Sequence, residues 1–277
     1  MRLNRRFSLL SSGGNIFAVP SFDGSHAIFG DKEKGYIECY SSGTITFPKS
    51  GVVDVFILGS GLRGAKGTAD GTGNTSDGMG RSTGGKGGNG ATGKTILAHN
   101  VDKGSYSITI GGACSSTSTA NASTAFGQTA NTVASNGGKG GYTYAVWGSG
   151  DDSNNTSTSG SKGSNGTSFP FAESTLNGSV NSSSIWNKKQ LGAGGGGGGA
   201  RSSGWKYAGG YDGGVYGGGK GGKYSGGVQS DCTAGVANTG SGGGGGGSAA
   251  YGASLSQFDG QPGGSGIIII RWGNWAA

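Results

Sequence analysis

The sequence is poor in most of the residues that do chemistry or build a large core. Its 277 residues include only four Pro, three Cys and two His, and 13% of them are charged. Cys39, Cys114 and Cys232 are far apart and odd in number, so they indicate neither a disulfide framework nor a metal site. Apolar residues make up 31% of the chain, which supports only a small core with much extended or irregular backbone around it.

Long apolar runs are also missing. No stretch approaches the ~20 apolar residues that a membrane span needs. The N-terminus begins with several arginines, as a signal peptide does, but the apolar run at 7–10 is far shorter than the ~7–15 residues of a secretory core. We therefore expect a protein made without conventional secretion and without membrane insertion.

The positive charge is not concentrated. The net charge is +7, yet the lysines and arginines are dispersed along the chain and form no basic helix. A nucleic-acid-binding surface would be clustered, so we expect no nucleic-acid partner. The charges serve either to keep a glycine-rich surface soluble or to attract an anionic cell surface.

Candidates for catalysis are few. His26 and His99 fall in or beside predicted strands, where histidine is ordinarily structural. No G-x-S-x-G elbow is present, and the pair Asp151-Asp152 has no further acids at calcium-loop spacing. We predict no catalytic residue, no metal site and no cofactor, and therefore a protein that is not an enzyme.

One sequence motif suggests nucleotide binding and hydrolysis. Residues 88–95 read GNGATGKT and match the phosphate-loop pattern G-x-x-x-x-G-K-[ST]. That loop needs a buried strand before it and a helix after it. Residues 80–87 (GRSTGGKG) cannot form a buried strand, and residues 95–101 (TILAHNV) are typical of a strand rather than a helix. We interpret the match as a product of composition.

Glycine is the residue in excess, with 68 copies. It recurs every third residue at 61–67 (GLRGAKG), 84–93 (GGKGGNGATG) and 160–166 (GSKGSNG). Three residues per turn with a rise of ~3.1 Å is the geometry of a left-handed extended helix, and four Pro exclude collagen. The hexaglycine runs 194–199 and 242–247 fit the interior of a bundle of such helices, or alternatively flexible linkers.

Short stretches rich in β-branched and aromatic residues predict strands, and none shows helical periodicity. The predicted strands are 25–29, 36–40, 44–47, 52–58, 95–101, 105–110 and 266–272. We expect 95–101 and 105–110 to form a hairpin around Gly104.

The chain resembles known protein families. The glycine motifs are similar to those of the distal tail-fibre adhesin of T-even-like bacteriophages, which implies a sandwich of polyglycine type II helices whose loops bind a bacterial receptor. These motifs lie at 84–90, 137–141, 193–199 and 240–247. Residues 36–277 also resemble the glycine-rich domain of phage and prophage virion proteins, through a strand pair of 43–51 with 52–59 and a closing strand GIIIIRW at 266–272. The glycine-rich ectodomain of anaplastic lymphoma kinase, a jelly-roll-like sandwich with polyglycine helices, is similar.

These features predict an all-β protein, a jelly-roll-like sandwich with an inserted polyglycine II helix bundle and almost no α-helix. Residues 1–35 would be an N-terminal attachment segment and first strand. Residues 36–277 would be a glycine-rich β-sandwich domain, with the bundle in 60–94 and 111–265 and the closing strand at 266–272.

Aromatic residues set among Ser, Asn, Asp and Gly are the candidate ligand-binding residues, because this is the composition of adaptable binding loops. The alternative is that they fill the core or brace loops. The candidates are Tyr142, Tyr144, Trp147, Trp186, Trp205, Tyr207, Tyr211, Tyr216 and Tyr224.

The resemblance implies a virion protein at a phage tail or fibre tip that binds host surface polysaccharide, or an outer-surface protein, without catalysis. The alternative is a purely structural virion component in the tail, baseplate or capsid decoration. A polysaccharide depolymerase is disfavoured because the sequence shows no acid cluster. Other virion proteins would be partners, and a homotrimer is plausible for such an appendage.

Overall fold

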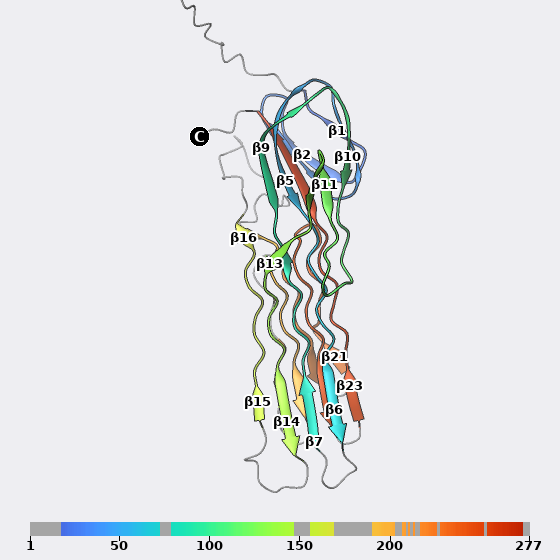
Figure 1. The fold of residues 1–277 in the computed structure, drawn as a ribbon, viewed down its shortest axis with the longest axis vertical. Helices are drawn as coiled ribbons and strands as arrows, with labels where there is room; N and C mark the ends of the chain where they lie inside the picture. Colours follow the sequence, from blue (N-terminus) through green and yellow to red (C-terminus); the bar gives the residue numbers. More distant parts are fainter. Residues whose placement is uncertain are drawn as a thin grey trace, which may run out of the picture.

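The computed structural model describes residues 18–72, 79–146, 156–168, 190–202, 207–208, 210, 213, 217–225, 228–251 and 254–273. They form a long, narrow molecule in three parts (Figure 1). A β-sandwich, here called the head, stands at one end; extended glycine-rich segments, the shaft, lead away from it; and short β-hairpins, the tip, form the other end. No described residue is α-helical, which confirms the predicted all-β fold class.

The head consists of two five-stranded sheets whose paired strands are all antiparallel. In sheet order, the first contains β1 (Ser21–Phe22), β4 (Gly43–Phe47), β10 (Gly104–Thr109), β11 (Ser123–Ala125) and β12 (Gln128–Ala130). The second contains β2 (His26–Gly30), β3 (Gly35–Cys39), β24 (Ile267–Trp272), β5 (Gly51–Leu58) and β9 (Lys94–Val101). Every strand predicted from the sequence is present to within one residue at either end.

The most apolar strand, β24, lies in the middle of its sheet between β3 and β5. Ile268 and Ile270 point into the core between the two sheets, while Ile267 and Ile269 belong to a second cluster with Leu191 on the outer face. All four isoleucines are fully buried. A strand covered on both faces needs no alternation of apolar and polar residues, which explains the uninterrupted IIII run.

Two connections in the head differ from the prediction. The sequence predicts a hairpin of 95–101 with 105–110, but β9 pairs with β5 whereas β10 pairs with β4. The predicted strand pair of 43–51 with 52–59 is also wrong, because β4 and β5 lie in different sheets. Each of these turns crosses from one sheet to the other. This path buries the apolar residues of β4 and β5 against each other across one core, where an in-plane hairpin would place them side by side in one sheet.

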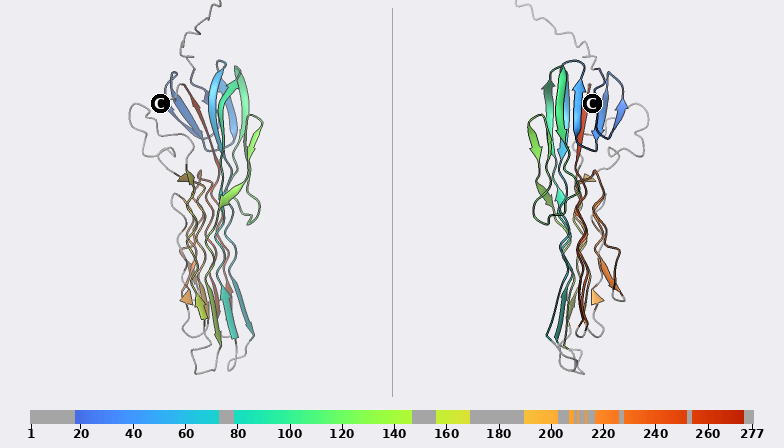
Figure 2. Two further views of the ribbon diagram at one scale, coloured as in Figure 1. Left: turned by 60° about the vertical axis from the view of Figure 1, so that its left-hand side comes forward. Right: turned by 90° about the vertical axis from the view of Figure 1, so that its right-hand side faces the viewer.

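Within the described ranges the shaft contains nine extended segments. Figure 2 shows that such segments run side by side between the head and the tip. They are S1 (59–67), S2 (84–90), S3 (136–141), S4 (159–166), S5 (192–199), S6 (217–222), S7 (231–236), S8 (240–247) and S9 (258–266). Two-stranded sheets mark the junction with the head: β8 (Gly90–Ala91) with β13 (Val133–Ser135), and β16 (Thr167–Ser168) with β17 (Gln190–Leu191).

The hydrogen bonds of the shaft repeat every three residues and run between segments. Gly61, Gly64 and Gly67 of S1 donate their N–H groups to carbonyls of S9 at 3.0, 3.0 and 2.9 Å. Leu62 and Ala65 donate instead to S2, at 2.8 and 2.7 Å. Residues three apart therefore face the same neighbour, as in the three-residue helix that the glycine spacing predicts.

The hexaglycine runs occupy the interior of the shaft, as predicted. Backbone hydrogen bonds connect S8 to S1, S2, S5, S6, S7 and S9, so it is surrounded on all sides, and S5 is connected to S2, S3, S4, S6 and S8. A Cβ on Gly242, Gly243 or Gly244 would overlap a carbonyl of S2, S9 or S6, respectively. Only glycine fits at these positions, and the linker alternative is wrong for these runs.

The tip contains two four-stranded sheets and one separate hairpin. In sheet order, the first contains β15 (Thr156–Thr158), β14 (Tyr142–Val146), β7 (Met79–Thr83) and β6 (Thr68–Thr72). The second contains β19 (Tyr207–Ala208), β18 (Ala200–Ser202), β22 (Ser248–Tyr251) and β23 (Ser254–Gln257). The hairpin pairs β20 (Lys223–Ser225) with β21 (Val228–Ser230).

Candidate functional site at the tip

The tip brings together chain reversals from widely separated parts of the sequence. The strand pairs β6–β7, β14–β15, β18–β19, β20–β21 and β22–β23 are all antiparallel. The first strand of each pair continues from a shaft segment or lies directly after one, and Figure 1 shows this end of the molecule opposite the head. The five connections between these strands are therefore bounded by strands of one small region.

The two tip sheets pack closely on each other, and their strands bound four of these connections. Strands β6 and β7 contact β22, and β7 also contacts β18. The facing residues are small: Ala69, Ser82 and Ser248 are all buried. The hydroxyls of Ser82 and Ser248 are hydrogen bonded at 2.7 Å, and Gln257 donates its side-chain N–H to the Ala69 carbonyl at 2.9 Å. Rigid strands that carry variable connections are a common arrangement for binding sites.

Four of the predicted ligand-binding residues lie in tip strands. Tyr142 and Tyr144 are in β14, Tyr207 is in β19 and Tyr224 is in β20. Strand β14 contacts β19, and β18, the neighbour of β19, contacts β20. The structure therefore gathers at one end positions that are more than 80 residues apart in the sequence.

The remaining candidates lie outside the described residues: Trp147, Trp186, Trp205, Tyr211 and Tyr216. In the sequence, Trp147 follows β14 directly and Trp205 falls between β18 and β19, so tip strands bound both. Trp186, by contrast, falls between β16 and β17, at the other end of the shaft.

The prediction that Tyr142 and Tyr144 lie in a binding loop is wrong, because Tyr142–Val146 form strand β14. The alternation of aromatic and β-branched residues in Tyr-Thr-Tyr-Ala-Val was the available signal for a strand. The glycine motifs on both sides of these residues favoured the loop interpretation instead.

The phosphate-loop match has no phosphate-binding geometry. Gly88 donates its N–H to Gly243 at 2.8 Å, Ala91 donates to Gly240 at 2.7 Å and Thr92 donates to a carbonyl of the head at 2.8 Å. The segment after the motif is strand β9, as predicted, so no helix N-terminus follows the loop. The N–H groups that would cradle a phosphate are used to hold S2 in the bundle.

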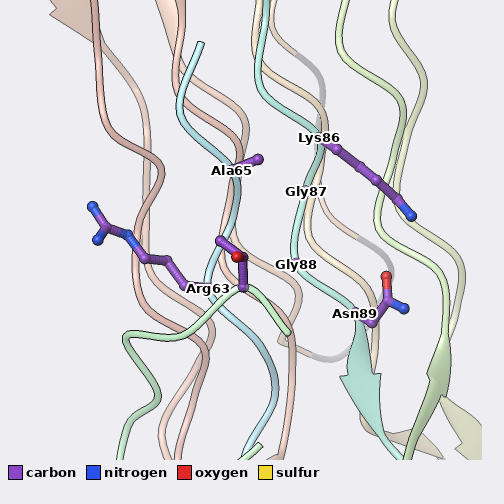
Figure 3. Close-up of a pocket in the computed structure, with 7 residues that line it drawn as sticks. Arg63, Ala65, Lys86, Gly87, Gly88 and Asn89 are labelled. Atoms are coloured by element: carbon purple, nitrogen blue, oxygen red, sulfur yellow. The ribbon is translucent and has the colours of Figure 1, made fainter. Parts of the chain in front are cut away.

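A pocket of about 110 Å³ opens on the shaft between S1 and S2, beside Thr117 (Figure 3). Arg63 and Lys86 line it but project to opposite sides. Arg63 donates its Nε–H to the Gly260 carbonyl at 3.0 Å and pairs with Asp259 at 3.5 Å. Because its polar groups do not converge, the pocket lacks the arrangement that defines a ligand site.

Within the described ranges, no group of His, Cys, Asp and Glu could hold a metal ion. None of the three cysteines forms a disulfide within the described part of the chain, and burial raises the pKa of Cys39 to about 12. No helix in the described part of the chain is long and apolar enough to cross a bilayer.

Comparison with known proteins identifies the domain. A family model described as a glycine-rich domain matches residues 40–273. The chain belongs to this glycine-rich domain family. The match runs from β4 through β24 and so takes in most of the head with all of the shaft and tip, which supports the prediction of a glycine-rich domain. No curated protein and no solved structure matches the glycine-rich domain.

Proposed function

We propose that this glycine-rich domain is the receptor-binding part of a bacteriophage tail or tail fibre and that its tip recognises a host surface glycan without catalysis. The observation that carries the proposal is the concentration of five strand connections, with aromatic positions in or beside them, at the end of a rigid shaft.

The positions of the first and last described strands support this orientation. The first described strand, β1, and the last, β24, both belong to the head, so the chain enters and leaves the structure there. The tip is made only of internal hairpins. Attachment of the head end to other virion proteins would leave the tip facing outward, at the far end of the shaft.

The residues that stabilise the shaft also differ from those that we propose to bind the receptor. The hydrogen bonds of the shaft involve backbone groups of S1–S9, whereas in the sequence the connections at the tip come between strands that lie outside these segments. The residues of the connections are therefore free to differ between receptors without loss of the lattice. Tyrosine and tryptophan among small polar residues provide flat apolar area for a sugar ring and hydrogen bonds for its hydroxyls.

The test is binding of the fluorescently labelled protein to a panel of bacterial strains, before and after periodate oxidation of surface sugars. We expect saturable, strain-specific binding that periodate abolishes. A folded protein that binds no strain would refute the proposal and favour a structural role in the virion.

Substitutions in the tip test whether this part of the protein contacts the receptor. Trp205→Ala, between β18 and β19, and replacement of 147–155, between β14 and β15, by a Gly/Ser segment of equal length should reduce cell binding and leave thermal stability unchanged. Leu97→Ala is the control, because Leu97 is an apolar side chain of the head that is 64% exposed. If the tip variants bind cells normally but prevent assembly into virions, the aromatic residues pack against neighbouring subunits instead.

A further inference from the structure

Four lysines from separate parts of the sequence lie at one height on the shaft. They are Lys66 in S1, Lys86 in S2, Lys139 in S3 and Lys162 in S4, and all four are exposed. We call them the lysine row. Each stands at an outward position of the three-residue repeat, between glycines that face the interior of the bundle.

Hydrogen bonds between the segments fix this common height. Ala65, next to Lys66, donates its N–H to the Lys86 carbonyl at 2.7 Å. Ser161, next to Lys162, donates to the Lys139 carbonyl at 2.9 Å. Between S2 and S3, Gly87 donates to Gly138 at 2.9 Å, which places Lys86 level with Lys139. Lys66 and Lys162 are thus each within one residue, roughly 3 Å along the shaft, of the other two.

The row crosses four neighbouring segments. S1 is hydrogen bonded to S2, S2 to S3, and S3 to S4. Adjacent hydrogen-bonded backbones lie roughly 5 Å apart, so the row extends roughly 15 Å across one flank of the shaft. Figure 3 shows Lys86 projecting outward from S2.

The four segments of the row contain no acid, since S1, S2, S3 and S4 have no Asp or Glu. An acid at the edge of this flank, Asp259 of the neighbouring S9, pairs with Arg63 of S1 at 3.5 Å. The ion pairs found among the described residues are Arg63–Asp259, Lys223–Asp231 and Arg271–Asp54, and none includes a lysine of the row. The row is therefore a local concentration of like charge.

Solubility alone does not account for this arrangement. Lysines spread around the shaft would provide the same net charge with less mutual repulsion, because repulsion falls with distance. Four lysines whose backbones are held at one height gain most from a partner that carries repeated negative charge. Lysine ammonium groups bind such groups as point charges.

We infer that the lysine row is a second binding surface, which holds an anionic polysaccharide with phosphate or carboxylate groups against the side of the shaft. Its role on a host cell rests on the proposed function, since it would hold the molecule at the charged cell surface while the tip engages its receptor. Binding of a purified polyanion does not depend on that function.

The experiment compares two variants of equal charge. In the row variant, Lys66, Lys86, Lys139 and Lys162 are replaced by Gln. In the control variant, four exposed lysines of the head, Lys32, Lys49, Lys94 and Lys103, are replaced by Gln. Each variant has four positive charges fewer than the native +7. Affinity for fluorescent inorganic polyphosphate and for polygalacturonate is measured over a range of salt concentrations, with neutral dextran as the negative control.

We expect the native protein and the head variant to bind at least one polyanion and the row variant to bind on the order of 10-fold more weakly at low salt. The slope of log affinity against log salt should decrease by roughly 3 in the row variant, or roughly 0.7 for each lost contact. Binding of polyphosphate alone assigns the row to phosphate groups, and binding of polygalacturonate alone assigns it to carboxylates.

Three results would overturn the inference: equal losses in both variants, no binding by the native protein, or self-association of the row variant in size-exclusion chromatography with light scattering. The last result would show that the lysines keep shafts apart. Failure of the proposed function looks different, because strain-specific, periodate-sensitive cell binding would be absent while polyphosphate or polygalacturonate still bound to the row.

Discussion

A single methyl group in the middle of the shaft should test the lattice directly. Gly245 donates its N–H to Gly196 and accepts a hydrogen bond from Gly222, both at 2.9 Å. A Cβ on Gly245 would overlap the carbonyl of Gly85, which itself accepts from Gly198 at 2.8 Å. The Gly245→Ala change must therefore push segments apart and strain three hydrogen bonds in one layer.

The expected cost follows from these contacts. Each strained backbone hydrogen bond is worth about 0.5–1.5 kcal/mol, and overpacking adds about 1–3 kcal/mol. We expect Gly245→Ala to lower the free energy of unfolding by about 3–7 kcal/mol. For a domain of this size that corresponds to a decrease in Tm of at least about 6 °C, measurable by circular dichroism or scanning calorimetry.

The matched control is Gly112→Ala. A Cβ on Gly112 would have no atom within 4 Å, and its backbone is not in the left-handed region. This change should raise stability by about 0.4–1 kcal/mol, because it restricts the unfolded chain. Equal Tm values for Gly245→Ala and Gly112→Ala would refute the close-packed lattice.

Four further outcomes concern two positions of the head and the cysteines. Asp54 accepts hydrogen bonds at 2.8 Å from the Arg271 guanidinium and from the Ala98 N–H, so Asp54→Ala should lower the free energy of unfolding in urea by about 2–4 kcal/mol, and an unchanged urea midpoint would contradict this. The pairing of β9 with β5 shifts register between Val53 and Val55, and in this bulge Ala98 has a φ of 51°. Ala98→Gly should therefore be neutral or raise that free energy by up to about 1 kcal/mol, and a clear loss would show that the bulge does not need this conformation. Burial raises the pKa of the Cys39 thiol from 9.0 to about 12, so a thiol reagent at pH 8 should label the partly exposed Cys232 and leave Cys39 unlabelled until urea unfolds the protein. The same shift means that stability is lost as the pH rises from about 9 toward 12, which unfolding measured across that range would reveal.

The sequence predicts the head strands and the glycine interior well, because both depend on local signals. Strand β5 has the β-branched and aromatic residues of a buried strand, and the runs at 194–199 and 242–247 have no side chain to exclude a neighbour. How strands pair is not a local property. The direction of the turn at Gly104, across the sandwich instead of within one sheet, depends on where β4 and β5 already lie.

The tip was harder to predict for a different reason. Its strands, such as β6 (TADGT) and β22 (SAAY), have few β-branched apolar residues and little intrinsic strand preference. They are strands because the shaft delivers two chains side by side in register, and because small residues let the two sheets approach. The aromatic candidates could be selected by composition, but only the structure shows that Tyr142, Tyr207 and Tyr224 come from strands at the same end.

The central positions of β24 and S8 also determine when this protein can fold. β24 fills the gap between β3 and β5, and S8 is hydrogen bonded to six other segments, yet both follow most of their partners in the sequence. S1 bonds to S9 across nearly 200 residues of sequence. A ribosome must therefore synthesise the domain from S1 through β24 before either the sheet or the bundle can close, so the domain folds late and slowly, as proteins dominated by distant contacts do.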